Sequence, residues 1–527
     1  MTPLVDQRER ELIHTALDRT MIVEAAAGTG KTTELVKRMV KVLAQGKARV
    51  EQIVAVTFTD KAAGELKLRL RSELEEARKA APQERSQRNL ADALARLEEV
   101  RVGTIHGFCA ELLRERPVEA RVDPQFEPMG DPEAERIYGE AFTLWLQAKL
   151  EDPPEGVRRS LRRKSKEGPV ERLRRAGWTL TGWRDFQEPW RRLPLAREAA
   201  VDALVQQLHD FARLASHPSN PRDYFYLDTR KARRISYEIR VIEKVRKRDY
   251  DGLEATFVEL AADRDFQRAK GYGKEYGEGV TRAEVLAAHQ QLVYALQKFA
   301  AAADADLAAL LQAELRETIQ RYEELKSRSG RLDFLDLLIL ARNLIRDCAH
   351  VRAEFQRRFT HIFIDEFQDT DPLQAEILLL LASDEPAVRD WRQVTPAPGK
   401  LFIVGDPKQS IYRFRRADVH IYQQVKKLLS ERGAVVLNLT TSFRAVPSIQ
   451  RMVNAAFAPV MTGDTATLQA DYVPLSPYRE EAHDQPTVVA LPVPEPYGKR
   501  GLAASAIEES LPDAVGAFVG WLLNESQ

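Results

Sequence analysis

Five short apolar runs alternate with helical patterns along the chain. They are Met21–Glu24, Ile53–Thr57, His361–Ile364, Leu401–Val404 and Val435–Asn438. Each run ends in a polar turn, and a helical pattern follows the turn. Unbroken apolar runs of this length are typical of parallel strands that are buried on both faces, with helices as the crossovers. The pattern therefore predicts an α/β fold with a parallel sheet.

From about residue 120 to 330 the apolar residues change to a helical period, which is clearest at Leu307, Leu311, Leu315, Ile319 and Tyr322. This change predicts a helical domain inserted into an α/β domain. We expect a first α/β domain from 1–118 and 331–432, a helical insertion of 119–330, and an incomplete second α/β domain over 433–527. In the last interval the pattern predicts a short strand near Thr487–Leu491 and a helix near Asp513–Leu523.

Two basic clusters lie inside the predicted insertion, and tryptophans follow the first. The first cluster is Arg158, Arg159, Arg162, Arg163, Lys164, Lys166, Arg172, Arg174 and Arg175, and the second is Arg230, Lys231, Arg233, Arg234, Lys244, Arg246, Lys247 and Arg248. Basic side chains beside Trp178, Trp183 and Trp190 could hold a phosphate backbone and stack bases. A solvated helix face with tryptophans in the core explains the same residues, and both interpretations stay open.

Composition narrows the class of protein. The chain has 527 residues, 44% of them hydrophobic, which is enough for several packed domains. Its net charge is zero, so the overall charge gives no argument for nucleic acid. Two cysteines are too few for a disulfide framework, no secretory signal is visible, and no apolar run reaches the ~20 residues of a membrane span. We expect a soluble, cytoplasmic, multidomain protein without a membrane partner.

A glycine-rich turn, Ala25-Ala-Ala-Gly-Thr-Gly-Lys-Thr32, follows the first predicted strand and opens a helix. This is the context that a phosphate loop requires, because its glycines let backbone N–H groups turn towards phosphate oxygens. Lys31 would reach the terminal phosphates, and the hydroxyl of Thr32 would hold Mg²⁺. The residues expected to bind ATP here are Ala25, Ala26, Ala27, Gly28, Thr29, Gly30, Lys31, Thr32 and Thr33.

An acidic pair, Asp365 and Glu366, ends the third apolar run. Ligands bind at the carboxyl ends of parallel strands, so these carboxylates are expected near the phosphate loop. Asp365 would coordinate hydrated Mg²⁺, and Glu366 would polarise the attacking water as a general base. A kinase for a small substrate does not need such an adjacent pair, whereas a nucleotide hydrolase coupled to motion does. The sequence therefore favours ATP hydrolysis.

Seven blocks, in order, resemble superfamily 1 DNA helicases of the UvrD/Rep type, with the greatest likeness to the RecB and AddA subunits of helicase–nuclease complexes. They are Glu24–Thr32, Thr57–Ala63, Gly103–Phe108, Leu332–Leu338, Ile364–Asp369, Val404–Phe414 and Leu439–Arg444. The resemblance implies a RecA-like P-loop domain, a helical insertion and the start of a second RecA-like domain. Between 130 and 330 the chain matches only in position and helical character.

The resemblance also implies roles for residues outside the phosphate loop. Gln7 matches the glutamine that reads the adenine edge. Contacts to single-stranded DNA are implied for Thr57, Phe58, Thr59, Lys61, Thr104, His106, Phe108, Tyr412, Phe414 and Arg415. The family often has asparagine at Asp60, whose carboxylate is not expected to face DNA phosphates. His106 is equally explained as a hydrogen-bonded core residue, and nine scattered histidines give no metal spacing.

Two further matches concern coupling and catalysis. Gln409 matches the sensor that touches both the γ-phosphate and the DNA-contact segment, and Tyr412 lies three residues further on. Phe414 stands where the family often has tryptophan, so its ring keeps a stacking face of smaller area. Arg444 matches an arginine finger that reaches the γ-phosphate from the second motor domain.

Together these likenesses imply an ATP- and Mg²⁺-dependent 3′→5′ DNA helicase of repair and recombination, acting on single-stranded and junction DNA. A possible partner is another component of a helicase–nuclease complex. Later family motifs are not found before Gln527, so we expect an N-terminal fragment with weak or no activity alone. Three alternatives stay open: a DNA-stimulated ATPase that does not unwind, a non-motor module that binds ATP and DNA, and RNA as the substrate.

Overall fold

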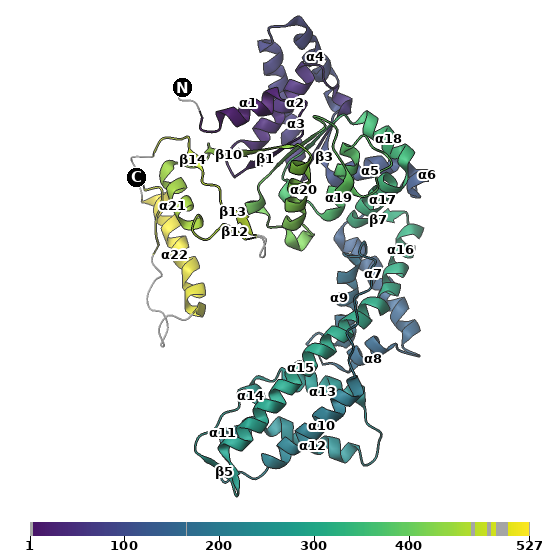
Figure 1. Cartoon of the computed structure of the whole chain (residues 1–527), viewed down its shortest axis with the longest axis vertical. Coiled ribbons are helices and arrows are strands. Elements are labelled where there is room, and N and C mark those ends of the chain that lie inside the picture. The colour runs from purple at the N-terminus through teal and green to yellow at the C-terminus, as the bar shows by residue number, and fades with distance from the viewer. Residues whose placement is uncertain (1–3, 165, 465–468, 482–485, 492–503, 526–527) are drawn as a thin grey trace. The chain divides into compact units, whose positions relative to one another are not determined.

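The computed structural model describes residues 4–164, 166–464, 469–481, 486–491 and 504–525 (Figure 1). The chain divides into two compact units, Met1–Val122 with Leu338–Gln527, and Asp123–Leu337. The first unit contains the parallel sheet and the second is mainly helical. Among the described residues, no helix combines the length and the apolar character needed to cross a membrane.

A six-stranded parallel sheet organises the first unit, in the order β10-β1-β9-β8-β2-β3. The strands are β1 Met21–Ala25, β2 Ile53–Thr57, β3 Arg101–Thr104, β8 His361–Ile364, β9 Leu401–Gly405 and β10 Val435–Leu439. All five predicted strands are confirmed. The four inner strands, β1, β9, β8 and β2, are buried almost throughout, so their sequences are nearly unbroken apolar runs. Both edge strands are partly exposed: β10 is still mostly apolar, whereas β3 was not predicted by the apolar pattern.

Helices cover both faces of the sheet (Figure 1). On one face, α1 Gln7–Thr15, α2 Lys31–Ala44, α3 Asp60–Ala80 and α4 Glu84–Ala95 share a core with alternate strand residues such as Val23 and Phe402. The other face carries α5 Ile105–Glu115, α19 Pro372–Ala382 and α20 Val419–Glu431. There, Glu24 of β1 accepts hydrogen bonds from Tyr422 at 3.2 Å and Lys426 at 2.7 Å, both on α20. Three further helices complete the elements around this sheet. They are the short α6 Pro117–Ala120 and the longer α17 Phe334–Asp347 and α18 Ala349–Arg358.

The predicted boundary at residue 433 is wrong. β10 pairs with β1 in parallel register from Met21↔Val435 to Ala25↔Leu439, so Val435–Leu439 is an edge strand of the first sheet. An apolar run shows that a strand exists, but it does not show which sheet accepts it. After β10, the described residues form β11 Thr441–Ser442, α21 Pro447–Phe457, β12 Thr462–Asp464, β13 Gln469–Asp471, β14 Ser476–Pro477 and α22 Ala504–Asn524. The helix expected near 513–523 is confirmed within α22, whereas 487–491 is not a strand.

The helical character of the inserted unit is confirmed. Its larger helices are α7 Asp131–Lys149, α8 Glu155–Arg162, α9 Pro169–Thr181, α10 Arg197–Leu214, α12 Arg230–Ile242, α13 Tyr250–Ala261, α15 Arg282–Glu314 and α16 Arg316–Arg328. Its shorter elements are α11 Tyr224–Asp228, α14 Arg264–Gln267, and the two-stranded ladders β4 Glu127–Pro128 with β7 Arg331–Leu332 and β5 Glu275–Gly277 with β6 Val280–Thr281. One core gathers around α10, α12, α13 and α15, and a second around α7, α9 and α16.

Ion pairs account for much of the first basic cluster. The side chain of Arg159 is fully buried and pairs with Glu254 at 2.9 Å and with Asp306 at 2.6 Å. Arg163 also pairs with Glu254, at 2.7 Å. Trp178 packs in the second core, with its ring centroid 5.5 Å from that of Tyr138. For these residues the structural interpretation holds, whereas Trp183 and Trp190 are exposed by 46% and 55%.

Candidate active site

The phosphate loop connects β1 to α2 through residues 26–30, and Lys31 is the first residue of the helix. Gly28 and Gly30 have φ values of 82° and 84°, a region that favours glycine. A Cβ on Gly28 would lie 2.5 Å from the Cβ of Arg444, and the N–H of Phe443 donates to the Gly28 carbonyl at 2.8 Å. Glycine at 28 therefore allows the loop to pack directly against the segment that carries Arg444.

Four predicted site residues meet at the carboxyl ends of the strands. Asp365 and Glu366 follow β8, which is separated from β1 in the sheet by β9 alone. The Thr32 hydroxyl donates to Oδ2 of Asp365 at 3.2 Å, and the Lys31 ammonium forms an ion pair with Glu366. Glu366 has a φ of 55°, uncommon for a residue with a side chain and frequent at functional sites. The arrangement places an ammonium, a hydroxyl and two carboxylates around one point.

Electrostatics at this point favour a bound cation. Asp365 is 8% exposed, and burial, followed by the neighbouring charge of Glu366, raises its pKa to about 6. A divalent cation beside the carboxylate would offset both effects. One carboxylate and one hydroxyl, completed by water and phosphate oxygens, is a donor set that suits Mg²⁺. Within the described residues there is no group of three or more His, Cys, Asp or Glu that could form an all-protein metal site.

Gln368 links the acidic pair to the Gln409 segment, although no sequence pattern singled it out. The residue is 2% exposed. Its amide nitrogen donates to Glu366 at 2.8 Å, and its amide oxygen accepts from the backbone N–H of Asp406 at 2.8 Å. The amide of Gln409 in turn donates to the Asp406 carboxylate at 2.6 Å. A hydrogen-bonded path therefore runs from Glu366 to Gln409.

Helix α1 and its N-cap residue contact the phosphate loop and the segment before Arg444 through two side chains outside the predicted set, Arg10 and Asp6. Arg10 donates to the Thr29 carbonyl at 2.9 Å and to Glu34 at 2.9 Å. Asp6 accepts from Arg10, from the N–H groups of Thr440 and Thr441 at 2.9 Å, and from the Thr441 hydroxyl at 2.8 Å. The predicted residue of this helix, Gln7, has an exposed amide that donates to Glu11 at 3.0 Å.

Three predicted DNA-contact aromatics form one cluster. The ring centroids of Phe58 and Tyr412 are 4.6 Å apart, and those of Tyr412 and Phe414 are 5.7 Å apart. Phe414 is 78% exposed, as stacking on a base requires. The residues come from the turn after β2 and from the segment after β9, and the fold brings them together. Arg415 is the last residue of the short 3₁₀ helix Arg413–Arg415, which also contains Phe414, but its side chain lies outside the described residues.

A DNA contact must lie at the surface, and Phe108 does not. Its ring is 5% exposed and packs 5.5 Å from the ring of Phe359, so we assign it to the core. The remaining predicted contacts keep their places near the strand ends. Thr59 and Thr104 accept the capping N–H groups of α3 and α5. Thr57 is 4% exposed and donates to the Thr59 carbonyl at 3.0 Å, so it is buried like Phe108 and not open to DNA. Lys61 is exposed on α3, and burial lowers the pKa of His106.

The other predicted residues lie around the phosphate loop. Ala25 and Ala26 are buried at its start, Ala27 is exposed, and Thr29 is fully buried, with its hydroxyl donating to the Ala26 carbonyl at 2.8 Å. Thr33 is half-buried on α2. The exposed Arg444 follows β11, beside Gly28.

This chain resembles known proteins over most of its length. The model of the UvrD/REP helicase N-terminal domain matches residues 5–430. The chain belongs to this family. It is also 26% identical over 510 residues to an ATP-dependent helicase/nuclease subunit of Syntrophomonas wolfei, covering 88% of this chain and 38% of that protein. The corresponding helicase/nuclease subunits of Listeria welshimeri and Moorella thermoacetica are each 26% identical, over 86% and 95% of this chain.

Membership in the UvrD/REP family concerns the part of the relatives that this chain covers. The chain spans 38% of the Syntrophomonas protein and 39% of the Listeria protein. The resemblance seen in the seven sequence blocks is thereby confirmed at the level of the family. One block, Leu332–Leu338, has a structural explanation in the helical unit. Its Asp333 and Asp336 both pair with Arg184, at 2.6 and 2.5 Å, and with Lys326, at 2.8 and 2.5 Å.

Replacing Asp6 with asparagine is expected to destabilise this UvrD/REP-type domain by about 2 kcal/mol at neutral pH. Burial alone would raise the pKa of Asp6, but hydrogen bonds from Arg10 and Thr441 lower it from 3.8 to about 2. A depressed pKa stabilises the fold above the unfolded value of 3.8, and that stabilisation is lost as the pH falls towards 2.

Urea unfolding, followed by circular dichroism between neutral pH and about pH 3, measures this difference. The difference in the free energy of unfolding between the wild type and Asp6→Asn should become smaller as the solution becomes more acidic. Asp92→Asn, which makes the same change at an exposed position on α4, should leave the free energy of unfolding unchanged. An Asp6→Asn gap that is absent at neutral pH, or equally large at the lowest pH, would contradict the assignment.

Proposed function

We propose that this chain is the ATP-hydrolysing part of a motor that moves along single-stranded DNA and unwinds duplexes. The observation that carries the proposal is the connected path from the Lys31–Glu366 pair, through Gln368 and Asp406, to the segment of Tyr412. A hydrolysis centre joined in this way to an aromatic cluster with an exposed ring is what coupling of ATP turnover to a nucleic acid requires. Family membership supports the same conclusion.

In the proposed reaction, Lys31 and the N–H groups of the phosphate loop hold the terminal phosphates of ATP. Glu366 orients the attacking water and accepts its proton. Arg444, which lies beside Gly28, stabilises the charge that develops on the γ-phosphate. Gln7 contacts the adenine edge, which requires its exposed amide to exchange Glu11 for the base.

Mg²⁺ would be held by Thr32 and Asp365 and would neutralise negative charge on the phosphates. Two side chains hold Glu366 directly. Lys31 forms an ion pair with its carboxylate, and Gln368 donates a hydrogen bond to it at 2.8 Å. These two contacts limit the positions that Glu366 can take relative to the attacking water.

DNA contact is proposed at the aromatic cluster and at the polar strand ends around it. Phe58, Tyr412 and Phe414 offer ring faces on which successive bases can stack, whatever the sequence. Thr59, Lys61, Thr104 and His106 would contact the phosphate backbone, with Arg415 extending the set. Thr57 would support this contact from the interior, by its hydrogen bond to the Thr59 carbonyl. Loss of the γ-phosphate changes what Gln409 contacts. Because Tyr412 lies only three residues further along the same segment, a movement of Gln409 also moves the ring on which a base stacks.

The direction and setting of the movement are inferred from the family. We propose 3′→5′ translocation on single strands, unwinding of junction and duplex DNA during cytoplasmic repair and recombination, and a partner of helicase–nuclease type. The last point follows the names of the relatives, which are subunits of a helicase/nuclease.

Displacement of streptavidin from biotinylated oligonucleotides tests the motor and its polarity. The complete gene product that contains these residues should remove streptavidin from a 5′ end in the presence of ATP and Mg²⁺, and much more slowly from a 3′ end. Displacement from the 3′ end alone would reverse the polarity, and ATP-independent displacement would refute the motor. A forked duplex distinguishes unwinding from translocation alone, and RNA oligonucleotides test the other substrate.

A further inference from the structure

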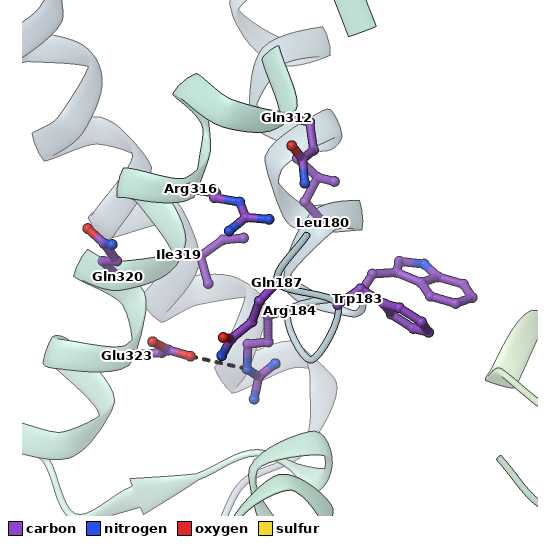
Figure 2. A pocket seen from close by; sticks show the side chains of 10 residues that line it. Leu180, Trp183, Arg184, Gln187, Gln312, Arg316, Ile319, Gln320 and Glu323 are labelled. Atoms are coloured by element: carbon purple, nitrogen blue, oxygen red, sulfur yellow. Dashed lines mark ion pairs between the residues drawn. The ribbon is translucent and has the colours of Figure 1, made fainter. Parts of the chain in front are cut away.

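A hollow of about 320 Å³ opens in the helical unit, between the end of α9, the turn that follows it, and α16. Figure 2 shows Arg316, Ile319 and Glu323 along one helix, with Leu180, Trp183 and Arg184 on the neighbouring segment. All of these residues belong to the helical unit described by itself. The volume lies at the small end of the ~300–1,000 Å³ range of ligand pockets, which suits one planar group.

Apolar and aromatic groups supply much of the lining. Leu180 and Ile319 are aliphatic, while Trp183 and Phe186 present rings that are exposed by 46% and 55%. The two rings lie near each other, with centroids 5.8 Å apart. Exposed aromatic rings at a polar-rimmed hollow are characteristic of sites that stack a flat ligand.

The polar groups of the hollow match the edge of a nucleobase. The Nη2 atom of Arg316 is buried and has no hydrogen-bond acceptor among the described residues. The exposed amides of Gln187 and Gln320 can each donate and accept. A nucleobase edge carries donors and acceptors side by side, so a guanidinium and two amides can pair with it. A purely apolar ligand would leave the buried Arg316 group unsatisfied.

Charge argues against the phosphate backbone as the group inside the hollow. Arg184 is committed to Asp333 at 2.6 Å and to Asp336 at 2.5 Å, and Glu323 lies 3.5 Å from the same guanidinium. Since Glu323 itself lines the hollow, the local charge is balanced rather than strongly positive. A neutral planar group is therefore favoured over a phosphate.

We propose that this hollow binds one unstacked nucleobase of single-stranded DNA, stacked on Trp183 and hydrogen-bonded to Arg316. The inference rests on the proposed function, since it assumes that the chain meets single-stranded DNA. It adds a contact in the helical unit that is independent of the aromatic cluster at the strand ends.

Fluorescence anisotropy at fixed salt, with a labelled single-stranded oligonucleotide and an abasic oligonucleotide of the same length, tests the hollow. Trp183→Ala should weaken binding of the base-bearing oligonucleotide by roughly 5- to 150-fold, the range for losing one stacked base. Binding of the abasic oligonucleotide should change little. Arg316→Met is a second variant that removes the hydrogen-bonding group without touching the rings, and it should show the same selectivity.

Tyr237→Ala is the matched control, because Tyr237 is 69% exposed on α12 of the same unit but does not line the hollow. The proposal is overturned if Trp183→Ala and Arg316→Met both bind the base-bearing oligonucleotide as the wild type does, or if the abasic oligonucleotide loses as much affinity. ATP turnover measured on the same samples separates the two failures. If DNA stimulates turnover but the two variants bind DNA as the wild type does, only the base-binding role of the hollow is refuted. If DNA does not affect turnover of the wild type, the proposed motor is refuted.

Discussion

Replacing Glu366 with glutamine is expected to lower the rate of ATP hydrolysis by about 10²- to 10⁴-fold, with ATP binding retained. Glutamine keeps the size of the side chain but cannot accept the proton of the attacking water. Lys31 and the backbone of the phosphate loop, which hold the phosphates, are unchanged. Single-turnover hydrolysis with excess protein, combined with equilibrium binding of a fluorescent ATP analogue, measures both quantities.

The matched control is Glu385→Gln, which makes the same change at an exposed site of the same unit and should leave hydrolysis unaffected. If Glu366→Gln hydrolysed ATP at the wild-type rate, Glu366 would not be the general base. A loss of nucleotide binding as large as the loss of rate would instead assign Glu366 to holding Lys31 in place.

Arg444→Ala is expected to reduce hydrolysis by about 10³-fold or more, the effect of losing an arginine finger. The guanidinium stabilises charge that appears only in the transition state, so the rate should fall far more than the affinity for ATP. Arg444→Lys should recover only part of the rate, because an ammonium cannot make the bidentate contact. The Cβ beside Gly28 is kept in both variants, which preserves the local packing.

Arg451→Ala is the control for this prediction, since Arg451 is an exposed arginine on the nearby α21 that pairs with Glu481 at 3.1 Å. It should hydrolyse ATP as the wild type does. Equal rates for Arg444→Ala and the wild type, measured in the complete gene product, would remove Arg444 from the site.

The sequence predicted the part of the fold in which local pattern and buried position coincide. Strands buried on both faces must be apolar nearly throughout, so β1, β2, β8 and β9 were visible as runs. The edge strand β10 was visible because four of its five residues are apolar, although it is partly exposed. The edge strand β3 was missed because its residues, Arg101–Thr104, are all partly exposed and include a glycine. Membership of β10 in the first sheet depends on pairing with β1, which lies more than four hundred residues away in the sequence.

In the candidate active site, the motifs located the side chains expected to contact ATP. They did not locate the side chains that hold these groups in position. Gln368 lies inside the block Ile364–Asp369, yet its role depends on Asp406, which only the fold brings within 2.8 Å. Asp6 and Arg10 belong to no motif, and their contacts span up to 435 residues. Phe108 was assigned to DNA by its block, whereas its burial against Phe359 follows from how α5 packs. A local motif shows which reactive side chains are present, and tertiary contacts determine which of them can reach a ligand.

The proposed coupling of hydrolysis to single-stranded DNA is tested most directly by steady-state ATP turnover with and without a single-stranded oligonucleotide. In the complete gene product, the DNA should raise turnover strongly in the wild type. It should raise turnover much less in Tyr412→Ala, whose ring lies 4.6 Å from that of Phe58. Without DNA, both proteins should hydrolyse ATP at the same low rate. Wild-type turnover that is identical with and without DNA would contradict the motor, even if ATP binds at Lys31.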